Sequence, residues 1–413
     1  MMPKKEQKPQ IRFKGFTDDW EQRKFKSTVQ IERGGSPRPI EDFVTNSENG
    51  LNWIKIGDAP SMGKYITKTA EKIKPEGLSK TREVHPGDLI LSNSMSFGRP
   101  YIMAINGCIH DGWLLIRNDK NLYDLQFLCH LLGSENMLHQ YKSFAAGSTV
   151  NNLNKDLVGN TTVSFPKKAE QSKLGALFDS LDNLITLHQR KYEKLKNIKK
   201  SMLEKMFPQN GNKIPEIRFK GFTDDWEQRK LSTIATMHAR IGWQNLRTSE
   251  FLDSGDYYLI TGTDFNDGKI DFKTCHFVAK ERYAQDKNIQ IKNGSILITK
   301  DGTLGKVAYV EVLDKPATLN AGVFNITIVD KNFENKYLFQ YLKAPFLMDY
   351  VEKKATGGTI KHLNQNILVD FPIVHPSYNE QTKIGAFFSK LDSLITLHQR
   401  MDISKGGRNV KDN

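Results

Sequence analysis

The side chains that could do chemistry in this sequence do not form a pattern that a catalytic site requires. Residues 302–306 look like the end of a phosphate-binding P-loop, but Val307 stands where Ser or Thr is needed. No two prolines are adjacent, which excludes the Asp-Pro-Pro-Tyr and Asn-Pro-Pro-Phe loops of amino-methyltransferases. No HExxH motif is present, and the ten histidines do not cluster at the spacing of metal ligands. We predict that the chain has no catalytic residue, no metal site and no cofactor of its own.

The chain is strongly basic. Its 60 Lys and Arg residues outnumber its 47 Asp and Glu residues, so the formal charge is +13 and the pI is near 9.3. A basic balance of this size is typical of proteins that bind a polyanion, such as a nucleic acid or an anionic membrane surface. A general solubility bias is the alternative explanation. The composition therefore favours a polyanionic partner.

The cysteines and the hydropathy of the sequence indicate the cellular compartment in which the protein is expected. Cys108, Cys129 and Cys275 lie far apart and form no CxxC pair, which fits a reducing compartment. No apolar run approaches the roughly 18 residues that a membrane span needs, so we expect no membrane partner. Residues 1–10 are basic and lack an apolar segment, so we expect a disordered tail and not a secretory signal. These features predict a cytoplasmic protein.

The chain is an internal duplicate. The stretch IRFKGFTDDWEQRK occupies residues 11–24 and occurs again, unchanged, at residues 217–230. KLGALFDSLDNLITLHQR at 173–190 corresponds to KIGAFFSKLDSLITLHQR at 383–400, and GSTVNNLN at 147–154 corresponds to GGTIKHLN at 357–364. Between these matching segments the two halves differ strongly. A repeat of domain size indicates two copies related by pseudo-twofold symmetry.

The unlike regions have the pattern of mixed, strand-rich domains. GDLILSN from residue 87 and GSILITK from residue 294 are short apolar runs bounded by glycine, as strands are. Residues 113–116 and 326–329 are β-branched or aromatic runs of the same kind. Helical spacing predicts a helix over residues 121–141, with a partner over 337–350 that Pro345 interrupts. The predicted fold class is α+β, with two pseudo-twofold-related globular domains separated by long coiled-coil helices.

A coiled-coil helix over residues 168–207 is the clearest structural prediction, because apolar residues recur there at heptad spacing. Its seam comprises Leu174, Leu177, Leu181, Leu184, the polar His188, Leu195, Ile198 and Met202. The second copy of the seam comprises Ile384, Phe387, Leu391, Leu394 and His398. After Arg400 the apolar stripe stops, so we expect the second helix to be shorter by about two heptads. A polar residue in a seam commonly sets helix register, which is the simplest explanation of the two histidines.

These patterns divide the chain as follows. We predict a disordered basic tail at 1–10, a first globular domain at 11–166, a long helix at 167–208, a linker at 209–216, a second globular domain at 217–372, a truncated helix at 373–400 and a polar tail at 401–413.

Taken together, these motifs resemble the specificity subunit of type I restriction-modification systems. The residues that carry the resemblance are TDDWEQRKL at 223–231 with its copy from residue 17, RGGSPRP at 33–39, the GDLILSN and GSILITK segments, GGTIKHLN, and the Phe-Pro, Glu-Gln and LITLHQR elements that occur twice. The resemblance covers essentially the whole chain. Each motif alone is weak, whereas the set in this order is specific.

The resemblance implies a function and a set of partners. Each variable region would be a target recognition domain that reads one half of a split, asymmetric sequence in double-stranded DNA. The conserved helices would pair antiparallel as a spacer and dock modification subunits, two in number, which use S-adenosylmethionine to methylate adenine at N6. Restriction subunits that use ATP and Mg²⁺ would translocate and cleave unmodified DNA. The chain itself would supply the DNA address.

Candidate DNA contacts are polar residues on glycine-rich loops, where the backbone can approach a duplex closely. In the first half they are Arg33, Gly34, Gly35, Ser36, Arg38, Asn93, Ser94, Ser96, Arg99, Ser148, Thr149 and Asn151. In the second half they are Arg240, Trp243, Gln244, Lys300, Thr303, Lys306, Gly357, Gly358, Thr359, Lys361 and His362. The simpler alternatives are solvated surface charges, plain tight turns and, for Trp243, a place in the core.

Two other functions stay open from the sequence. The shortened second helix fits a DNA-binding module that acts alone because it cannot assemble with other subunits. A single-chain nuclease or methyltransferase with an unrecognised active site is the third hypothesis, and the missing Pro-Pro loop counts against it.

Overall fold

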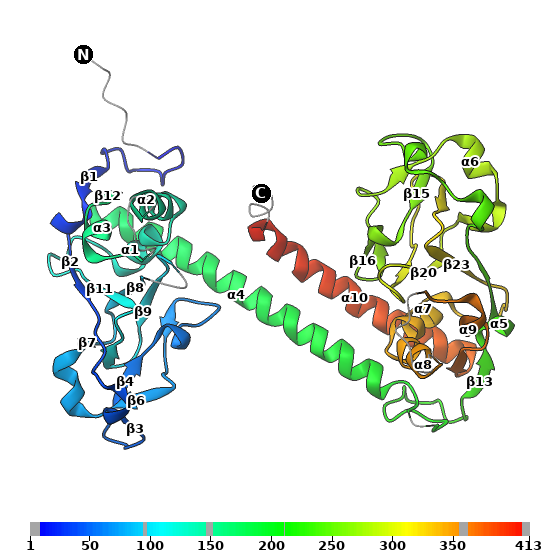
Figure 1. The fold of residues 1–413 in the computed structure, drawn as a ribbon, viewed down its shortest axis with the longest axis horizontal. Helices are drawn as coiled ribbons and strands as arrows, with labels where there is room; N and C mark the ends of the chain where they lie inside the picture. Colours follow the sequence, from blue (N-terminus) through cyan, green and yellow to red (C-terminus); the bar gives the residue numbers. More distant parts are fainter. Residues whose placement is uncertain (1–8, 94–96, 146–151, 210, 355–361, 407–413) are drawn as a thin grey trace, which may run out of the picture. The chain divides into compact units, whose positions relative to one another are not determined.

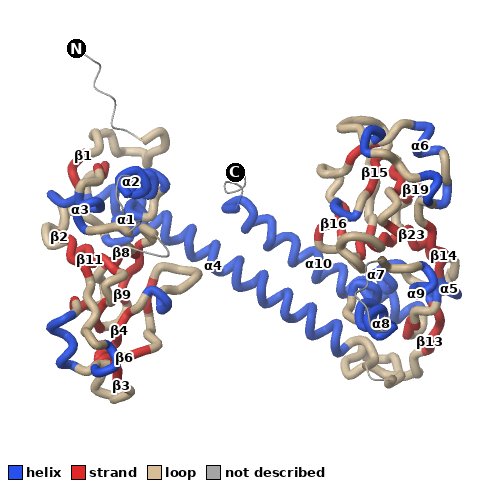
Figure 2. Tube along the Cα trace, in the orientation of Figure 1, coloured by secondary structure: helices blue, strands red, loops and turns tan. Residues whose placement is uncertain are grey.

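The computed structural model describes residues 9–93, 97–145, 152–209, 211–354 and 362–406. The chain divides into two compact units, unit 1 at residues 1–189 and unit 2 at residues 190–413. Each unit combines strand-rich globular structure with part of a long helix (Figure 1, Figure 2).

Two five-stranded sheets form the globular part of unit 1. The first has the strand order β2 (Gln30–Arg33), β11 (Trp113–Arg117), β8 (Leu89–Ser92), β9 (Pro100–Met103) and β5 (Tyr65–Ile66). The second has the order β3 (Val44–Thr45), β6 (Glu71–Ile73), β4 (Leu51–Ile54), β10 (Gly107–Ile109) and β7 (Arg82–Val84). Strands β4 and β10 are parallel, and β10 pairs antiparallel with β7.

Unit 2 repeats four of the five strands of each sheet in the same order, with a different sequence and, among the described residues, without counterparts of β5 and β3. Its first sheet has the order β14 (Ala235–His238), β23 (Val323–Ile328), β20 (Ile296–Thr299) and β21 (Val307–Tyr309). Its second sheet has the order β18 (His276–Phe277), β15 (Tyr258–Ile260), β22 (Ala317–Leu319) and β19 (Gln290–Ile291), and a small hairpin joins β16 (Phe265–Asn266) to β17 (Lys269–Ile270). Strands β15 and β22 are the parallel pair here, in the place of β4 and β10. The duplication predicted from the sequence is therefore present in the strand topology.

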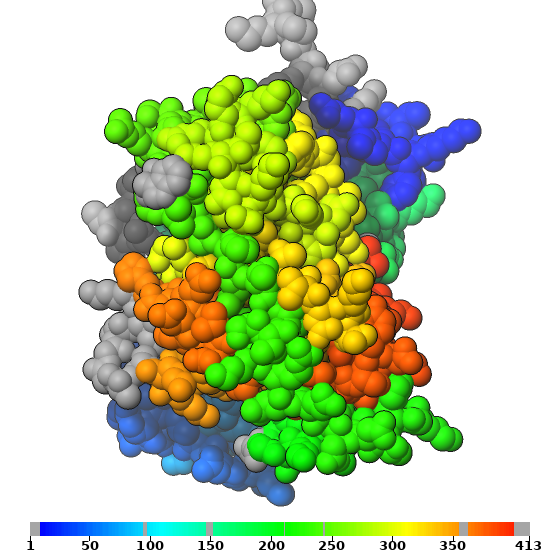
Figure 3. All heavy atoms as spheres, turned by 90° about the vertical axis from the view of Figure 1, so that its right-hand side faces the viewer, coloured from blue at the N-terminus to red at the C-terminus, as the bar shows by residue number. Residues whose placement is uncertain are grey.

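A two-stranded ribbon closes each unit and uses the repeated block directly. In unit 1 the last four residues of the block form β1 (Glu21–Lys24), which pairs antiparallel with β12 (Thr162–Phe165). In unit 2 the same letters form β13 (Glu227–Lys230), which pairs with β24 (Pro372–His375). Figure 3 shows the green surface of the β13 and β14 segment lying between the yellow and orange surfaces of its partner segments. The entry of each unit is thus joined to the strand that leads into its long helix.

Short helices cover the first sheet of each unit. In unit 1 they are α1 (Leu125–Leu132), α2 (Glu135–Ala145) and α3 (Lys155–Gly159). In unit 2 they are α5 (Leu231–Ile234), α7 (Asn335–Lys343), α8 (Phe346–Lys354) and α9 (Gln365–Val369), whereas α6 (Lys280–Ala284) lies beside β15 of the second sheet (Figure 1). The single helix predicted over 121–141 is wrong: Asp124 caps the N-terminus of α1 by accepting from Phe127 N, and α1 ends at Gly133. The spacing of the apolar residues continues across this break, so the spacing alone does not reveal that the helix ends there.

The two long helices differ from the prediction mainly at their ends. Helix α4 (Lys168–Lys205) has 38 residues, which agrees with the helix predicted over 168–207. Helix α10 (Tyr378–Gly406) has 29 residues, so it begins later than the predicted residue 373 and continues past residue 400. The late start arises because residues 372–375 are extended in β24, where they pair with β13. The predicted polar tail at 401–413 is therefore helical up to Gly406.

Within unit 2 the last turns of α4 pack antiparallel against α10. Phe207 stacks on Phe388 with ring centroids 5.9 Å apart, and Lys199 Nζ lies 2.5 Å from Asp392 Oδ1, so residue numbers rise along one helix as they fall along the other. The predicted seam residues that pack around this core are Leu195, Ile198, Met202, Ile384, Phe387 and Leu391. Leu394 is half-buried and His398 is buried.

The remaining seam residues of α4 belong to unit 1 and behave differently. Leu174 packs against the core of unit 1, and His188 is half-buried. Leu177, Leu181 and Leu184 are 43%, 44% and 52% exposed, so no helix in the described part of the chain covers them, and their role in helix or subunit pairing stays a prediction. The heptad pattern predicts an apolar helix surface in both copies of the repeat. It does not predict in which copy another helix packs against that surface.

A charged and hydrogen-bonded joint fixes each long helix to its globular domain. The Arg12 guanidinium donates twice to the Glu170 carboxylate, at 2.7 Å and 2.7 Å, and Glu170 is only 1% exposed. Gln171 accepts from Asp124 N at 2.9 Å and donates to Pro166 O at 2.8 Å and Leu122 O at 3.1 Å.

Unit 2 has the same joint. Arg218 donates to both oxygens of Glu380 at 2.8 Å, and Gln381 accepts from Glu334 N at 3.0 Å while donating to Pro376 O at 2.9 Å. The Glu-Gln pair of the repeat therefore positions the first turn of each helix.

Replacing Gln171 tests the joint. Gln171→Ala should lower the free energy of unfolding of unit 1 by about 2–4 kcal/mol, because three backbone groups lose a partner and the bond to Pro166 O is buried. Ser180→Ala, which removes only a local bond to Ala176 O on exposed helix surface, should change it by less than about 0.5 kcal/mol. Urea denaturation followed by hydrogen exchange of the α1 amides measures both, and equal protection in the two variants would contradict this role.

Candidate nucleic-acid interface

The predicted contact residues of unit 1 come from segments that meet at one end of the first sheet. Strands β2 and β8 both run antiparallel to β11, so the residues that follow them lie beside the start of β11. Gly34 N donates to Trp113 O at 2.9 Å, and Asn93 N donates to Gly112 O at 3.0 Å. Leu153 N donates to Asn93 O at 3.0 Å, which ties the chain after residue 151 to the same place. The fold therefore assembles one loop cluster from four parts of the sequence.

Basic side chains surround His110 in this cluster. Burial lowers the pKa of His110, the adjacent Asp111 carboxylate raises it, and the positive charges of Lys55, Arg38 and Arg33 lower it again. Arg33 and Arg38 are exposed, whereas Lys55 lies over the Trp53 ring with Nζ 5.8 Å from the centroid. The three cations therefore face a common region that includes a histidine with a lowered pKa.

Asp111 is a residue of this cluster that the sequence reasoning missed. Its carboxylate accepts from Ser36 Oγ at 3.2 Å and lies 2.9 Å from His110 Nδ1. Its backbone oxygen accepts from Asn93 Nδ2 at 2.8 Å and from Arg33 Nε at 3.4 Å. An Asp-Gly pair is a turn signal that could have identified the position. The residue organises the loops around it and leaves one carboxylate among the basic groups.

The glycines of the cluster have a packing role. A Cβ at Gly34 would lie 2.2 Å from His110 O, and a Cβ at Gly35 would lie 2.4 Å from Lys80 O. Both distances are far shorter than a side chain tolerates. These glycines therefore allow backbone segments to approach each other, and their place in the predicted interface follows from the loops that they hold.

Two other predicted contacts in unit 1 have internal roles in the structure. Asn93 is buried, with both its side-chain amide and its backbone engaged in the loop cluster. Arg99 donates to Ser61 O and Gly63 O at 3.2 Å each and lies over the Tyr101 ring at 5.1 Å. The burial of Asn93 corrects the prediction that its side chain is presented to DNA, whereas a DNA contact by the half-buried Arg99 stays a prediction. Ser94, Ser96, Ser148, Thr149 and Asn151 lie outside the described residues.

The corresponding loop cluster of unit 2 carries different side chains. Lys300 N donates to Gly322 O and Leu363 N donates to Lys300 O, both at 2.9 Å. Thr303 and Lys306 are exposed, and Lys300 Nζ lies 5.5 Å from the Phe324 ring centroid. The exposed His362 has Nδ1 2.6 Å from Oδ1 of Asp301, a second carboxylate that the prediction omitted. Gly357, Gly358, Thr359 and Lys361 lie outside the described residues, as does the side chain of Trp243.

Arg240 is a structural residue, which corrects its predicted role as a DNA contact. It is 2% exposed, and its guanidinium donates to Leu319 O at 2.8 Å, Thr318 Oγ1 at 3.2 Å and Gln244 O at 3.3 Å. Burial lowers the pKa of Arg240. Gln244 is also buried. The Arg240 side chain joins β22 of the second sheet to the segment after β14, and neither side chain faces solvent.

One pair of hydrogen bonds shows that the two clusters are built alike. The bond from Leu153 N to Asn93 O in unit 1 corresponds to the bond from Leu363 N to Lys300 O in unit 2. The bonds to Gly112 O and Gly322 O correspond in the same way. The backbone frame is shared, whereas the exposed groups are Arg33 and Arg38 in one unit and Thr303, Lys306 and His362 in the other.

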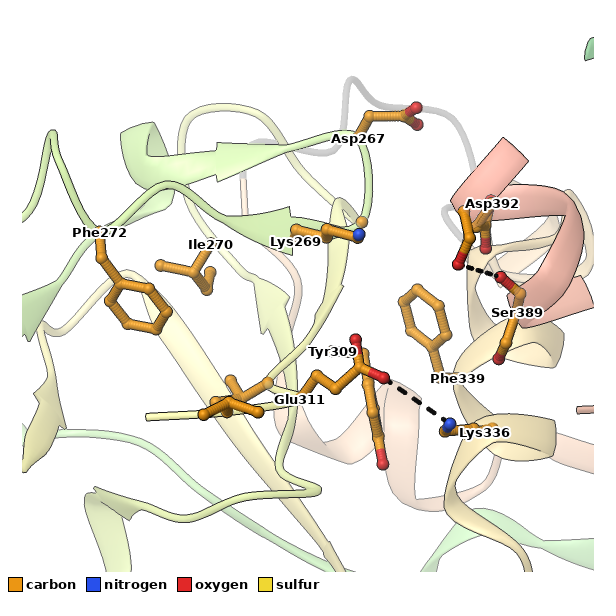
Figure 4. A pocket seen from close by; sticks show the side chains of 14 residues that line it. Asp267, Lys269, Ile270, Phe272, Tyr309, Glu311, Lys336, Phe339, Ser389 and Asp392 are labelled. Atoms are coloured by element: carbon orange, nitrogen blue, oxygen red, sulfur yellow. Dashed lines mark hydrogen bonds and ion pairs between the residues drawn. The ribbon is translucent and has the colours of Figure 1, made fainter. Parts of the chain in front are cut away.

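A hollow of about 270 Å³ lies in unit 2 between β17, β21, α7 and α10 (Figure 4). Two ion pairs lie at this hollow: Glu311 is 3.8 Å from Lys336, and Asp267 is 3.1 Å from Lys343. Figure 4 shows Tyr309 and Phe339 between the sheet side and the helix side of the hollow. The hollow is a junction between the helix and the domain.

Over the described ranges, no group of three or more His, Cys, Asp or Glu residues is placed to hold a metal ion. In the same ranges no helix has the length and apolar character that a membrane crossing requires. The three cysteines are free and buried, and burial raises the pKa of Cys108 to about 11.

Comparison with known proteins gives a consistent family. The profile of the "Type I restriction modification DNA specificity domain" matches residues 17–197 and again residues 223–403. A putative type I restriction enzyme MjaX specificity subunit from Methanocaldococcus jannaschii is 22% identical over 407 residues, covering 93% of this chain and 89% of the relative. The type I restriction enzyme EcoBI specificity subunit from Escherichia coli is 21% identical, covering 91% of this chain and 81% of the relative.

A solved structure is similar in fold. The crystal structure of the type I restriction-modification system S subunit from M. genitalium aligns with a TM-score of 0.57 at 16% identity, and the alignment covers 97% of both chains.

The correction at Arg240 generates a direct test. Arg240→Ala should lower the free energy of unfolding of unit 2 by about 2–4 kcal/mol, because three buried acceptors lose their donor. Arg33→Ala removes an exposed guanidinium and should change stability by less than about 0.5 kcal/mol. Urea denaturation with hydrogen exchange of the β22 amides reports the effect. Equal stability of the two variants would contradict the structural assignment of Arg240.

Proposed function

The chain belongs to the type I restriction-modification DNA specificity family, and on that basis we propose that it recognises a bipartite DNA target, one half-site per unit. As a specificity subunit it is a non-catalytic component of such a system. Its contribution is to place partner subunits on the DNA.

The observation that carries the proposal is one backbone frame with two sets of exposed side chains. Four strands of each sheet follow the same order in both units, and both units have the same hydrogen bond between the loop after the central strand and the segment at 153 or 363. The exposed groups on those loops differ between the units. A frame that is repeated while its exposed loop residues change supports two readers of different base sequence.

The side chains of the loops suit contact with a DNA duplex. Exposed Arg33, Arg38 and Lys306 can neutralise phosphates, which positions a protein without specifying sequence. Arginine can also bind O6 and N7 of guanine in the major groove, and a carboxylate such as that of Asp111 can accept from the N4 amino group of cytosine. Base readout and phosphate anchoring are therefore both available within one loop cluster.

The proposal includes the partners that the sequence resemblance implies. Modification subunits, two in number, would carry S-adenosylmethionine and methylate adenine at N6. Restriction subunits would use ATP and Mg²⁺ to translocate and cleave DNA that lacks the methyl groups. The antiparallel helices would serve as spacer between the half-sites and as docking surface, because half-site readers need a fixed separation. A protein with these partners would act on DNA in the cytoplasm.

Salt-dependent DNA binding tests the proposed interface without knowledge of the target sequence. Affinity for a mixed-sequence duplex should fall steeply as salt rises, since each neutralised phosphate releases counterions. Arg33→Ala and Arg38→Ala should each reduce the slope of log affinity against log salt by about 1. Fluorescence anisotropy of labelled DNA, titrated with the full chain at several salt concentrations, measures this slope.

Arg23→Ala is the matched control, because it removes the same charge from an exposed residue that already pairs with Glu21 on β1. Its slope should equal that of the unaltered chain. A flat salt dependence of the unaltered chain, or equal losses in all three variants, would contradict the assignment of the interface to the loop cluster.

A further inference from the structure

The first half of α4 presents an apolar row to solvent. Leu177, Phe178, Leu181 and Leu184 are 43%, 42%, 44% and 52% exposed, respectively. They lie in the repeated segment that begins at residue 173, so each has a counterpart 210 residues later in α10. We call these four residues, together with Asp182, the open face.

The counterpart of the open face in unit 2 is covered. Phe388 is fully buried and Leu391 is 8% exposed, while Phe387 and Leu394 are half-buried. The covering residues come from the last turns of α4 and its end: Leu195, Ile198, Met202, Leu203, Met206 and Phe207. One amphipathic surface therefore occurs twice, and the structure shows what kind of segment fits it.

The charged side chains differ between the open face and its counterpart in unit 2. The difference fits binding of a similar helix at the open face. In unit 2 the buried Lys199 pairs with Asp392 at 2.5 Å, and Gln340 Nε2 donates to the other carboxylate oxygen at 2.7 Å. The counterpart of Asp392 is Asp182. The Oδ2 atom of Asp182 lies 3.9 Å from Nε2 of His130. The Asp182 side chain is 46% exposed, against 18% for Asp392. The Asp182 carboxylate is thus accessible to a further cation, although Lys64 Nζ lies 3.2 Å from the neighbouring His130 Nε2.

We propose that the open face binds a basic amphipathic helix supplied by a separate polypeptide, with the residue pattern of this chain's own segment 191–207. That pattern places apolar side chains at the positions of Leu195, Ile198, Met202 and Phe207 and a lysine at the position of Lys199. Six lysines against two glutamates give the segment a formal charge of +4, which complements the Asp182 carboxylate, while the nearby Asp179 is already paired with Lys64 Nζ at 2.5 Å.

A second intact copy of the chain is disfavoured as the occupant. Its own segment is already engaged, since Phe207, Met206 and Lys199 are all buried within unit 2. The inference concerns a protein partner and does not depend on the proposed recognition of DNA.

A peptide with the sequence of residues 191–208, labelled at its N-terminus, tests the proposal against the full chain by fluorescence anisotropy. It should bind saturably at micromolar concentration. Leu181→Asp in the chain should weaken binding about tenfold or more, because a charge replaces a central apolar contact. Leu187→Asp is the matched control: its counterpart Leu397 remains 54% exposed beside the covering helix, so binding should not change. Both residues are exposed, so neither substitution should unfold the chain.

Charge reversal separates specific docking from general adhesion of a basic peptide. A peptide carrying Lys199→Glu should bind about tenfold more weakly, and Asp182→Lys in the chain should restore its binding. No saturable binding, or binding that Leu181→Asp leaves unchanged, would overturn the proposal; the second result would indicate exchange with the chain's own segment in unit 2. Dimerisation of the chain alone that Leu181→Asp abolishes would also overturn it, since the occupant would then be a second copy.

Discussion

The fold depends on a buried carboxylate at the start of each long helix. Glu170 and Glu380 are 1% exposed, and each is matched by an arginine near the start of its own repeat, Arg12 or Arg218. A buried carboxylate without such a partner is costly, so the helix cannot take its place unless the entry segment is docked. The orientation of the helix relative to the sheets, and hence of the loops that the sheets carry, follows from this pair.

The joint explains much of the repeated block at 11–24 and 217–230. Beyond its arginine, the block supplies Phe16 and Phe222, whose rings lie 5.0 Å from Lys173 Nζ and 4.7 Å from Lys383 Nζ on the two helices. Its tryptophans pack edge-on against Phe127 and Phe207. Its last four residues form the ribbon strand in each unit. These roles account for strong similarity, whereas identity at all fourteen positions fits recent duplication or exchange between the two copies.

Sequence reasoning succeeded where the information is local or repeated. The duplication predicted a shared topology, and the heptad pattern located α4 nearly to its ends. It failed where the outcome depends on contacts between distant residues. Arg240 lies in a glycine-containing loop and suggests a surface charge, but it is buried because Thr318 and Leu319, almost eighty residues later, supply its acceptors. The exposure of Leu181 could not be predicted either, since Leu391 has the same heptad position and is covered.

The separation between a constant frame and two variable readers is the central claim, and exchanging one reader tests it most directly. The segment between β1 and β12, residues 25–161, would be replaced by the equivalent segment of a relative, which leaves both ribbon strands and both arginine–glutamate pairs in place. The measurement is a map of methylated adenines in DNA from cells that express the hybrid with its modification subunit. The account predicts a bipartite target in which one half changes while the other half is retained. A change in both halves, or in neither, would contradict it.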